Sequence, residues 1–84
     1  MSEILAVVGP ITTAARLEKK LKSRGDLRAR AISTPVELGG GGCSYSVITS
    51  LENEGFLRSF KGKYVKKIYI IEGSGEKRVY HDIS

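Results

Sequence analysis

The clearest candidate for chemistry in this 84-residue chain is a run of four glycines followed by its only cysteine, Cys43, and then Ser44. Glycine adopts backbone angles that are closed to other residues and lets a ligand or another chain approach the backbone closely. A cysteine at such a loop has the access that thiol exchange requires. The pattern favours a reactive thiol, and the alternative is a plain turn before a strand, with Cys43 as a small buried apolar residue.

A carrier thiol needs its anion stabilised, because the thiolate is the reactive form and a free cysteine has a pKa of about 8.5. Consecutive backbone N–H groups in the glycine run would form a nest for a thiolate or persulfide. Nearby hydroxyls would donate hydrogen bonds. We therefore expect a catalytic thiol and five anion- or ligand-binding residues: Cys43, Gly40, Gly41, Gly42, Ser44 and Thr34. Three arginines are candidates for a cation beside the thiol: Arg16, Arg28 and Arg30.

Other site chemistries find little support in the residue types. One cysteine and one histidine give no internal disulfide and no structural zinc set, so neither a metal nor a cofactor is expected. A Cys43–His81 dyad is conceivable by residue type, but a histidine facing solvent on an edge strand is the favoured interpretation of His81. The glycine run lacks the Gly-Lys-Ser/Thr ending of a P-loop.

Length and charge predict one domain over residues 1–84 with a small core. The chain has no apolar run near the roughly 20 residues that span a membrane and no basic leader, so we expect neither a membrane span nor a signal peptide. A single cysteine fits a reducing cytoplasm. The net charge of +5 leaves nucleic acid as an alternative partner. However, neither basic cluster, at 16–24 or 58–67, has the interleaved aromatic pattern of a base-stacking platform, which favours two solvated faces.

Hydrophobic patterning predicts strands at 3–8, 27–33, 43–49, 65–72 and 78–83. The first is a continuous apolar run, typical of a buried strand, and in the second we expect Leu27 to point inward with Ala29 and Ala31. The last two strands should form a hairpin. A helix is expected over 13–24, capped by Thr12 or Thr13 and ended by Gly25.

A second helix is expected from Ser50 to about Gly62, with Leu57, Phe60 and Tyr64 at helical spacing. Because Gly55 weakens this helix, Asn53-Glu54-Gly55 is an alternative turn between strands. The expected order is β-α-β-β-α-β plus one strand. This predicts an α+β, ferredoxin-like split β-α-β sandwich with an extra C-terminal β-strand, its sheet covered on one face by two helices.

Two motifs resemble those of a known family. Thr34-Pro35-Val36-Glu37-Leu38 precedes a small-residue loop and Cys43, and Ala14-Ala15-Arg16-Leu17-Glu18-Lys19 opens the first helix. Over roughly residues 4–71 the chain resembles the small bacterial and archaeal family described as putative Se/S carrier protein-like. Family loops are often serine-rich with glycine after the cysteine, whereas here the loop is all glycine and Ser44 follows. The resemblance implies that Cys43 accepts a persulfide or selenide and that the partners are sulfur or selenium donor and acceptor proteins.

Two other functions compete with a carrier. A non-catalytic module would present its basic faces to RNA or an acidic protein, and its affinity would fall steeply with salt. A homodimer would form through an exposed strand edge in the final hairpin. The residue types favour a carrier or binding protein over a turnover enzyme.

Overall fold

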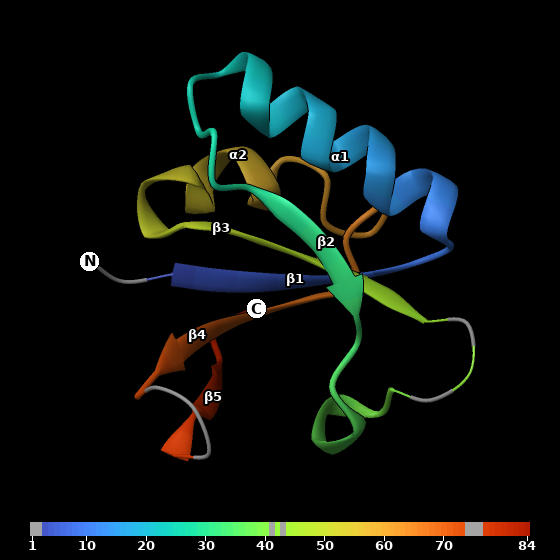
Figure 1. Cartoon of the computed structure of the whole chain (residues 1–84), viewed down its shortest axis with the longest axis vertical. Coiled ribbons are helices and arrows are strands. Elements are labelled where there is room, and N and C mark those ends of the chain that lie inside the picture. The colour runs from blue at the N-terminus through green and yellow to red at the C-terminus, as the bar shows by residue number, and fades with distance from the viewer. Residues whose placement is uncertain (1–2, 41, 43, 74–76) are drawn as a thin grey trace.

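The computed structural model describes residues 3–40, 42, 44–73 and 77–84. Within them, five strands form one antiparallel sheet in the order β2-β3-β1-β4-β5 (Figure 1). The elements follow in the order β1 (Glu3–Gly9), α1 (Ile11–Ser23), β2 (Arg30–Ser33), η1 (Val36–Leu38), β3 (Tyr45–Ser50), η2 (Leu51–Asn53), α2 (Glu54–Arg58), β4 (Lys67–Glu72) and β5 (Val79–Asp82), where η marks a 3₁₀ helix. The predicted α+β class is confirmed.

Strand β1 lies at the centre of the sheet, as its continuous apolar run predicts. Its residues Ile4, Leu5 and Ala6 are fully buried, because β3 and β4 flank the strand and both of its faces are covered. Successive side chains point to opposite faces, so β1 contributes to two cores. The core under the helices contains Ile4, Ala6, Val8, Ala14, Leu17, Leu21, Val47, Leu57 and Ile68, among others. The opposite face carries a smaller core of Leu5, Ile48 and Ile71.

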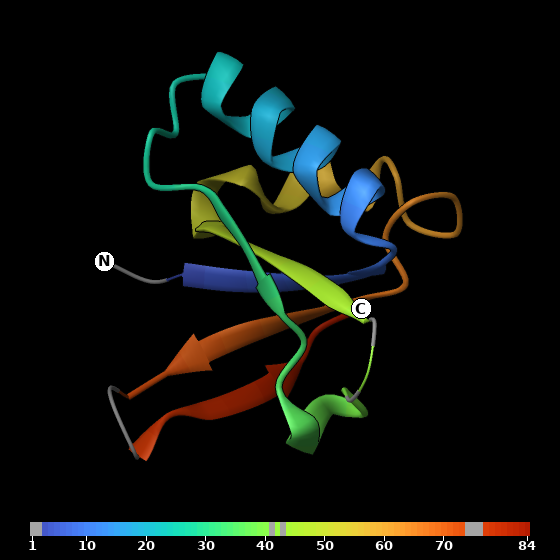
Figure 2. The same ribbon diagram turned by 45° about the vertical axis from the view of Figure 1, so that its right-hand side comes forward.

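Both α-helices cover the same face of the sheet, and η1 lies on the other face (Figures 1 and 2). Helix α1 buries Ala14, Leu17 and Leu21, the three positions that its helical period predicts. Its N-cap is Pro10, without a side-chain cap, so the predicted threonine cap is wrong. At the other end Gly25 has a φ of 105°, and this left-handed conformation ends the helix, as predicted.

The second helical region is shorter than its periodicity predicts. Helix α2 ends at Arg58, and Phe60 and Tyr64 lie in the turn that follows. The N–H of Tyr64 donates to the carbonyl of Phe60 at 3.0 Å, and Gly62 has a φ of 89°, which reverses the chain. The alternative of a turn between strands at residues 53–55 is wrong, because η2 and α2 occupy this region.

Strand β2 begins at Arg30 rather than at residue 27, and Leu27 is 80% exposed, so its predicted inward position is wrong. The cause is a local turn: Asp26 accepts a hydrogen bond on its side chain from the N–H of Arg28 and on its carbonyl from the N–H of Ala29. Strands β3 and β4 also start two residues later than expected, at Tyr45 and Lys67. The predicted final hairpin is confirmed by the antiparallel pairing of β4 with β5. No helix in the described ranges is long and apolar enough to cross a membrane.

Candidate functional site

The segment that joins β2 to β3 forms a loop whose two ends are tied together. The N–H of Thr34 donates to the carbonyl of Ser44 at 2.9 Å. The hydroxyl of Thr34 hydrogen-bonds to the hydroxyls of Ser44, at 3.0 Å, and Ser46, at 2.7 Å. Thr34 and Ser46 are buried, so these polar contacts replace lost water contacts and fix the base of the loop.

The first half of the loop folds back on itself. After Pro35, η1 turns the chain, and Gly39 follows in the left-handed conformation at a φ of 84°. The carbonyl of Pro35 accepts hydrogen bonds from the N–H of Leu38, at 3.0 Å, and from the N–H of Gly40, at 3.1 Å. The side chain of Leu38 packs against the smaller core on the face opposite the helices. This turn therefore anchors the loop to the sheet.

Gly40 is held where only glycine fits. A Cβ atom at this residue would lie 1.9 Å from the carbonyl oxygen of Thr34 and 2.7 Å from that of Pro35. Its N–H already donates to Pro35 and is therefore not available to an anion in this conformation. Gly40 thus allows a close approach of two backbone segments, whereas a free donor was predicted.

The structure brings three of the predicted site residues together. Thr34 contacts Ser44 through side chain and backbone, and Gly40 packs on the backbone of Thr34. Gly42 is exposed at a φ of 69°, with open space around its Cα. The other two predicted residues, Gly41 and Cys43, lie outside the described residues.

The candidate cations are placed less favourably for a role in this loop. Arg28 and Arg30 lie before and at the start of β2, whereas the loop follows the end of that strand. Arg30 is also engaged by Glu3, at 3.4 Å, and by the carbonyl of Arg28, at 3.3 Å. Arg16 lies on α1, on the helix face of the sheet.

His81 sits on β5, at the edge of the sheet opposite β2. Its Nε2 atom lies 3.3 Å from a carboxylate oxygen of Glu72 on the neighbouring strand β4, and its side chain is 53% exposed. This is the solvent-facing edge histidine that the sequence favours.

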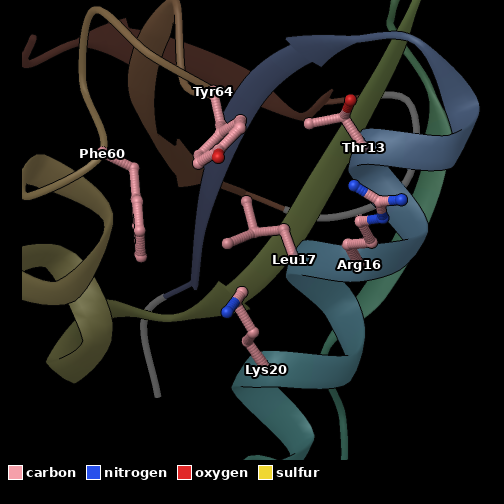
Figure 3. Close-up of a pocket in the computed structure, with 6 residues that line it drawn as sticks. All are labelled: Thr13, Arg16, Leu17, Lys20, Phe60 and Tyr64. Atoms are coloured by element: carbon pink, nitrogen blue, oxygen red, sulfur yellow. The ribbon is translucent and has the colours of Figure 1, made fainter.

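A second candidate site lies on the helix face, between α1 and the turn at residues 60–64. Here a pocket of about 320 Å³ is lined by Thr13, Arg16, Leu17, Lys20, Phe60 and Tyr64 (Figure 3). The four α1 residues recur at intervals of three or four and therefore share one stripe of the helix. The sequence does not reveal this site, because its basic and aromatic residues are about 40 positions apart and only tertiary folding puts them side by side.

A comparison with known protein families gives a match over most of the chain. The model of the family described as "Putative Se/S carrier protein-like" matches residues 3–70. No curated protein and no solved structure matches the chain. The matched segment runs from β1 to the fourth residue of β4 and includes the Thr34–Ser44 loop with Cys43. Because it spans most of the 84 residues, the chain belongs to the Se/S carrier protein-like family.

Proposed function

We propose that this protein carries sulfur or selenium on the thiol of Cys43. The observation that carries the proposal is the family match over residues 3–70, which includes the only cysteine of the chain. The loop around it supports the proposal. Its base is tied by Thr34 and Ser44, and its glycines leave a backbone without side chains next to the thiol in sequence.

The transfer is a thiol exchange. The Cys43 thiolate attacks the outer sulfur of a donor persulfide, R–S–SH. A new S–S bond forms as the donor S–S bond breaks, and the donor leaves as the thiolate R–S⁻. A perselenide donor, R–S–SeH, delivers selenium in the same way. The loaded Cys43 then passes the outer atom to an acceptor thiolate and returns to the thiolate form, so the cycle needs no external oxidant.

The proposal also includes the partner proteins, the cellular compartment and the fold type. The partners are sulfur or selenium donor and acceptor proteins, and a reducing cytoplasm would keep the thiol free. The strand order β2-β3-β1-β4, with β5 added at the edge, supports a ferredoxin-like plan. Such a plan leaves one sheet face without helices, and the loop anchors to that face through Leu38.

The test is intact-protein mass spectrometry after incubation with a small-molecule persulfide donor. We expect the wild type to gain the mass of one sulfur atom and to lose this mass on reduction. The Cys43→Ser variant should gain no mass, because only the thiolate is nucleophilic. A matched control is the double variant C43S/S59C, which moves the only thiol to an exposed position after α2.

The control separates a carrier site from an ordinary thiol. We expect the moved thiol to load at least about tenfold more slowly at pH 7, since an activated thiol has a pKa below the usual value of about 8.5. Equal loading rates for the wild type and C43S/S59C would contradict the proposal. Absence of an adduct on the wild type, together with slow alkylation of Cys43, would also contradict it.

A further inference from the structure

We propose that the pocket between α1 and the turn at residues 60–64 binds a small ligand that combines a planar ring with a phosphate group, the chemistry of a nucleoside monophosphate. The pocket joins two cations, a hydroxyl, an apolar floor and two aromatic rings. The proposal does not rest on the carrier function of Cys43.

The cationic side of the pocket is formed by Arg16 and Lys20. They are exposed and one helical turn apart, where like charges repel each other. Among the described residues, no carboxylate lies within 4.0 Å of either, whereas Lys22 pairs with Glu18 at 3.1 Å. A phosphate between the two cations would relieve the repulsion and accept charge-assisted hydrogen bonds.

Thr13 adds a neutral hydrogen-bond donor beside these cations. Since Pro10 is the N-cap, Thr13 lies inside α1, and its hydroxyl makes no hydrogen bond with the part of the chain that the structure describes. A hydroxyl can donate to a phosphate oxygen as well as accept. In Figure 3, Thr13 and Arg16 lie at one end of the pocket lining and Lys20 at the other, with Leu17 between them.

The aromatic side consists of Phe60 and Tyr64, whose ring centroids are 5.8 Å apart at an interplanar angle of 53°. Leu17, only 3% exposed, forms the floor and points toward the two rings (Figure 3). Tyr64 is 51% exposed, so its ring presents area to solvent next to an apolar surface. In other proteins, stacking of a base on such a ring strengthens binding severalfold or more.

The size of the pocket favours a mononucleotide over a longer ligand. Its volume of about 320 Å³ lies at the lower end of the roughly 300–1,000 Å³ of small-molecule sites. One ring with its phosphate is a suitable occupant. The pocket also lies on the other face of the sheet from Leu38, which anchors the described part of the loop between β2 and β3. Leu17 and Phe60 pack into the core under the helices, whereas Leu38 of the loop packs on the opposite face of the sheet.

The test is an NMR titration at low salt in which amide chemical shifts report binding. AMP is the probe, and adenosine and inorganic phosphate, its two halves, are titrated separately. We expect AMP to shift the amides of Thr13, Lys20 and Tyr64, and to bind about tenfold or more tightly than either half. Equal affinities for AMP and inorganic phosphate would overturn the ring contact.

Variants then assign the contacts. We expect R16Q/K20Q to weaken AMP binding by about thirtyfold. Tyr64→Leu should weaken AMP binding by about tenfold. Tyr64→Leu should also weaken the binding of adenosine but not that of inorganic phosphate. The control K77Q/R78Q also removes two positive charges, but from exposed residues just before β5, so AMP affinity should change by less than about twofold.

Three results would overturn the proposal. The first is a control that weakens binding as much as R16Q/K20Q, which would indicate a general charge effect. The second is a set of AMP-induced amide shifts that lie only outside the pocket. The third is a single-stranded oligonucleotide that binds far more tightly than AMP and shifts amides across both basic clusters, which would indicate a nucleic-acid surface instead. Because Cys43→Ser should leave AMP affinity unchanged, failure here is distinct from failure of the carrier proposal.

Discussion

Replacing Asp26 by alanine is expected to lower the free energy of unfolding by roughly 2–4 kcal/mol, because several polar groups lose a charged hydrogen-bond partner. One carboxylate oxygen of Asp26 accepts hydrogen bonds from the hydroxyl of Thr49, from the N–H of Ser50 at 3.0 Å and from the side-chain amide of Asn53 at 3.3 Å. Thr49 and Asn53 are 1% and 7% exposed. Asp26, which follows α1, thus joins this segment to the end of β3 and to the last residue of η2.

Urea denaturation of the wild type and the variant measures this loss. The matched control is Glu52→Ala, which also removes one negative charge but from an exposed side chain in η2. We expect the control to change the free energy of unfolding by less than about 0.5 kcal/mol. A similar loss in both variants would mean that net charge, rather than the hydrogen bonds of Asp26, sets the effect.

The contribution of Asp26 should also depend on pH in a defined direction. Burial acts to raise the pKa of Asp26, but its hydrogen bonds, led by those from Thr49 and Ser50, together outweigh burial, so its pKa in the folded protein lies below the ordinary value of 3.8. The unfolded chain therefore takes up this proton first as the pH falls. The stabilisation is complete above that value and is lost as the pH falls through the folded pKa. The difference between the wild type and Asp26→Ala should narrow over this range, and a constant difference would contradict the mechanism.

The parts of the fold that could be predicted from the sequence are those that local patterns specify. The apolar run of β1, the spacing of Ala14, Leu17 and Leu21 in α1, and the alternation of the final hairpin each depend on neighbours within one element. Gly25 ends α1 as expected for the same reason. Such signals need no knowledge of the tertiary structure.

The parts that could not be predicted depend on contacts between distant segments. Leu27 alternates like a strand residue, but Asp26 forms the local turn and bonds to residues more than 20 positions away, so the strand starts later. Phe60 and Tyr64 keep helical spacing, yet the chain reverses at Gly62 and places both rings beside α1. Neither segment alone therefore predicts that these two aromatic residues lie next to the basic helix α1.

For the candidate site too, the sequence predicts local features but not the contacts between distant segments. The sequence points to the loop because glycines and a lone cysteine stand together, and it adds Thr34 and Ser44, whose hydroxyls lie 3.0 Å apart in the structure. It could not assign their contacts, since Thr34 bonds to Ser44 and Ser46 only when β2 pairs with β3. It also could not separate a glycine needed for a free N–H from one needed for close packing, as at Gly40.

Replacing Gly40 by alanine is expected to lower the free energy of unfolding by about 3 kcal/mol or more, unless the loop abandons its conformation. The new Cβ atom would lie 1.9 Å from the carbonyl oxygen of Thr34, and backbone atoms cannot move aside as a flexible side chain can. Relief requires breaking the hydrogen bond from Gly40 to Pro35 or the pairing of Thr34 with Ser44. Urea denaturation measures the cost, and the alkylation rate of Cys43 reports whether the loop has rearranged.

Two other glycines separate the steric cause from other effects of alanine. Gly39 has a φ of 84° with open space around it, so Gly39→Ala should cost only about 1 kcal/mol through backbone strain. Gly55, in α2, has neither a positive φ nor a close neighbour. Gly55→Ala should therefore stabilise the protein by up to about 1 kcal/mol through helix propensity.

The order of the three variants decides what the glycine run does for the thiol. If Gly40→Ala is the most costly and changes the alkylation rate of Cys43 while Gly55→Ala does not, close packing of Gly40 on Thr34 sets the loop that presents the cysteine. If Gly40→Ala costs no more than Gly39→Ala, the loop has another accessible conformation in which the N–H of Gly40 is free. In that conformation the N–H of Gly40 would be able to bind an anion, as the sequence predicts. The rate of sulfur loading of the Gly40→Ala variant would then measure how much this N–H contributes to loading of Cys43.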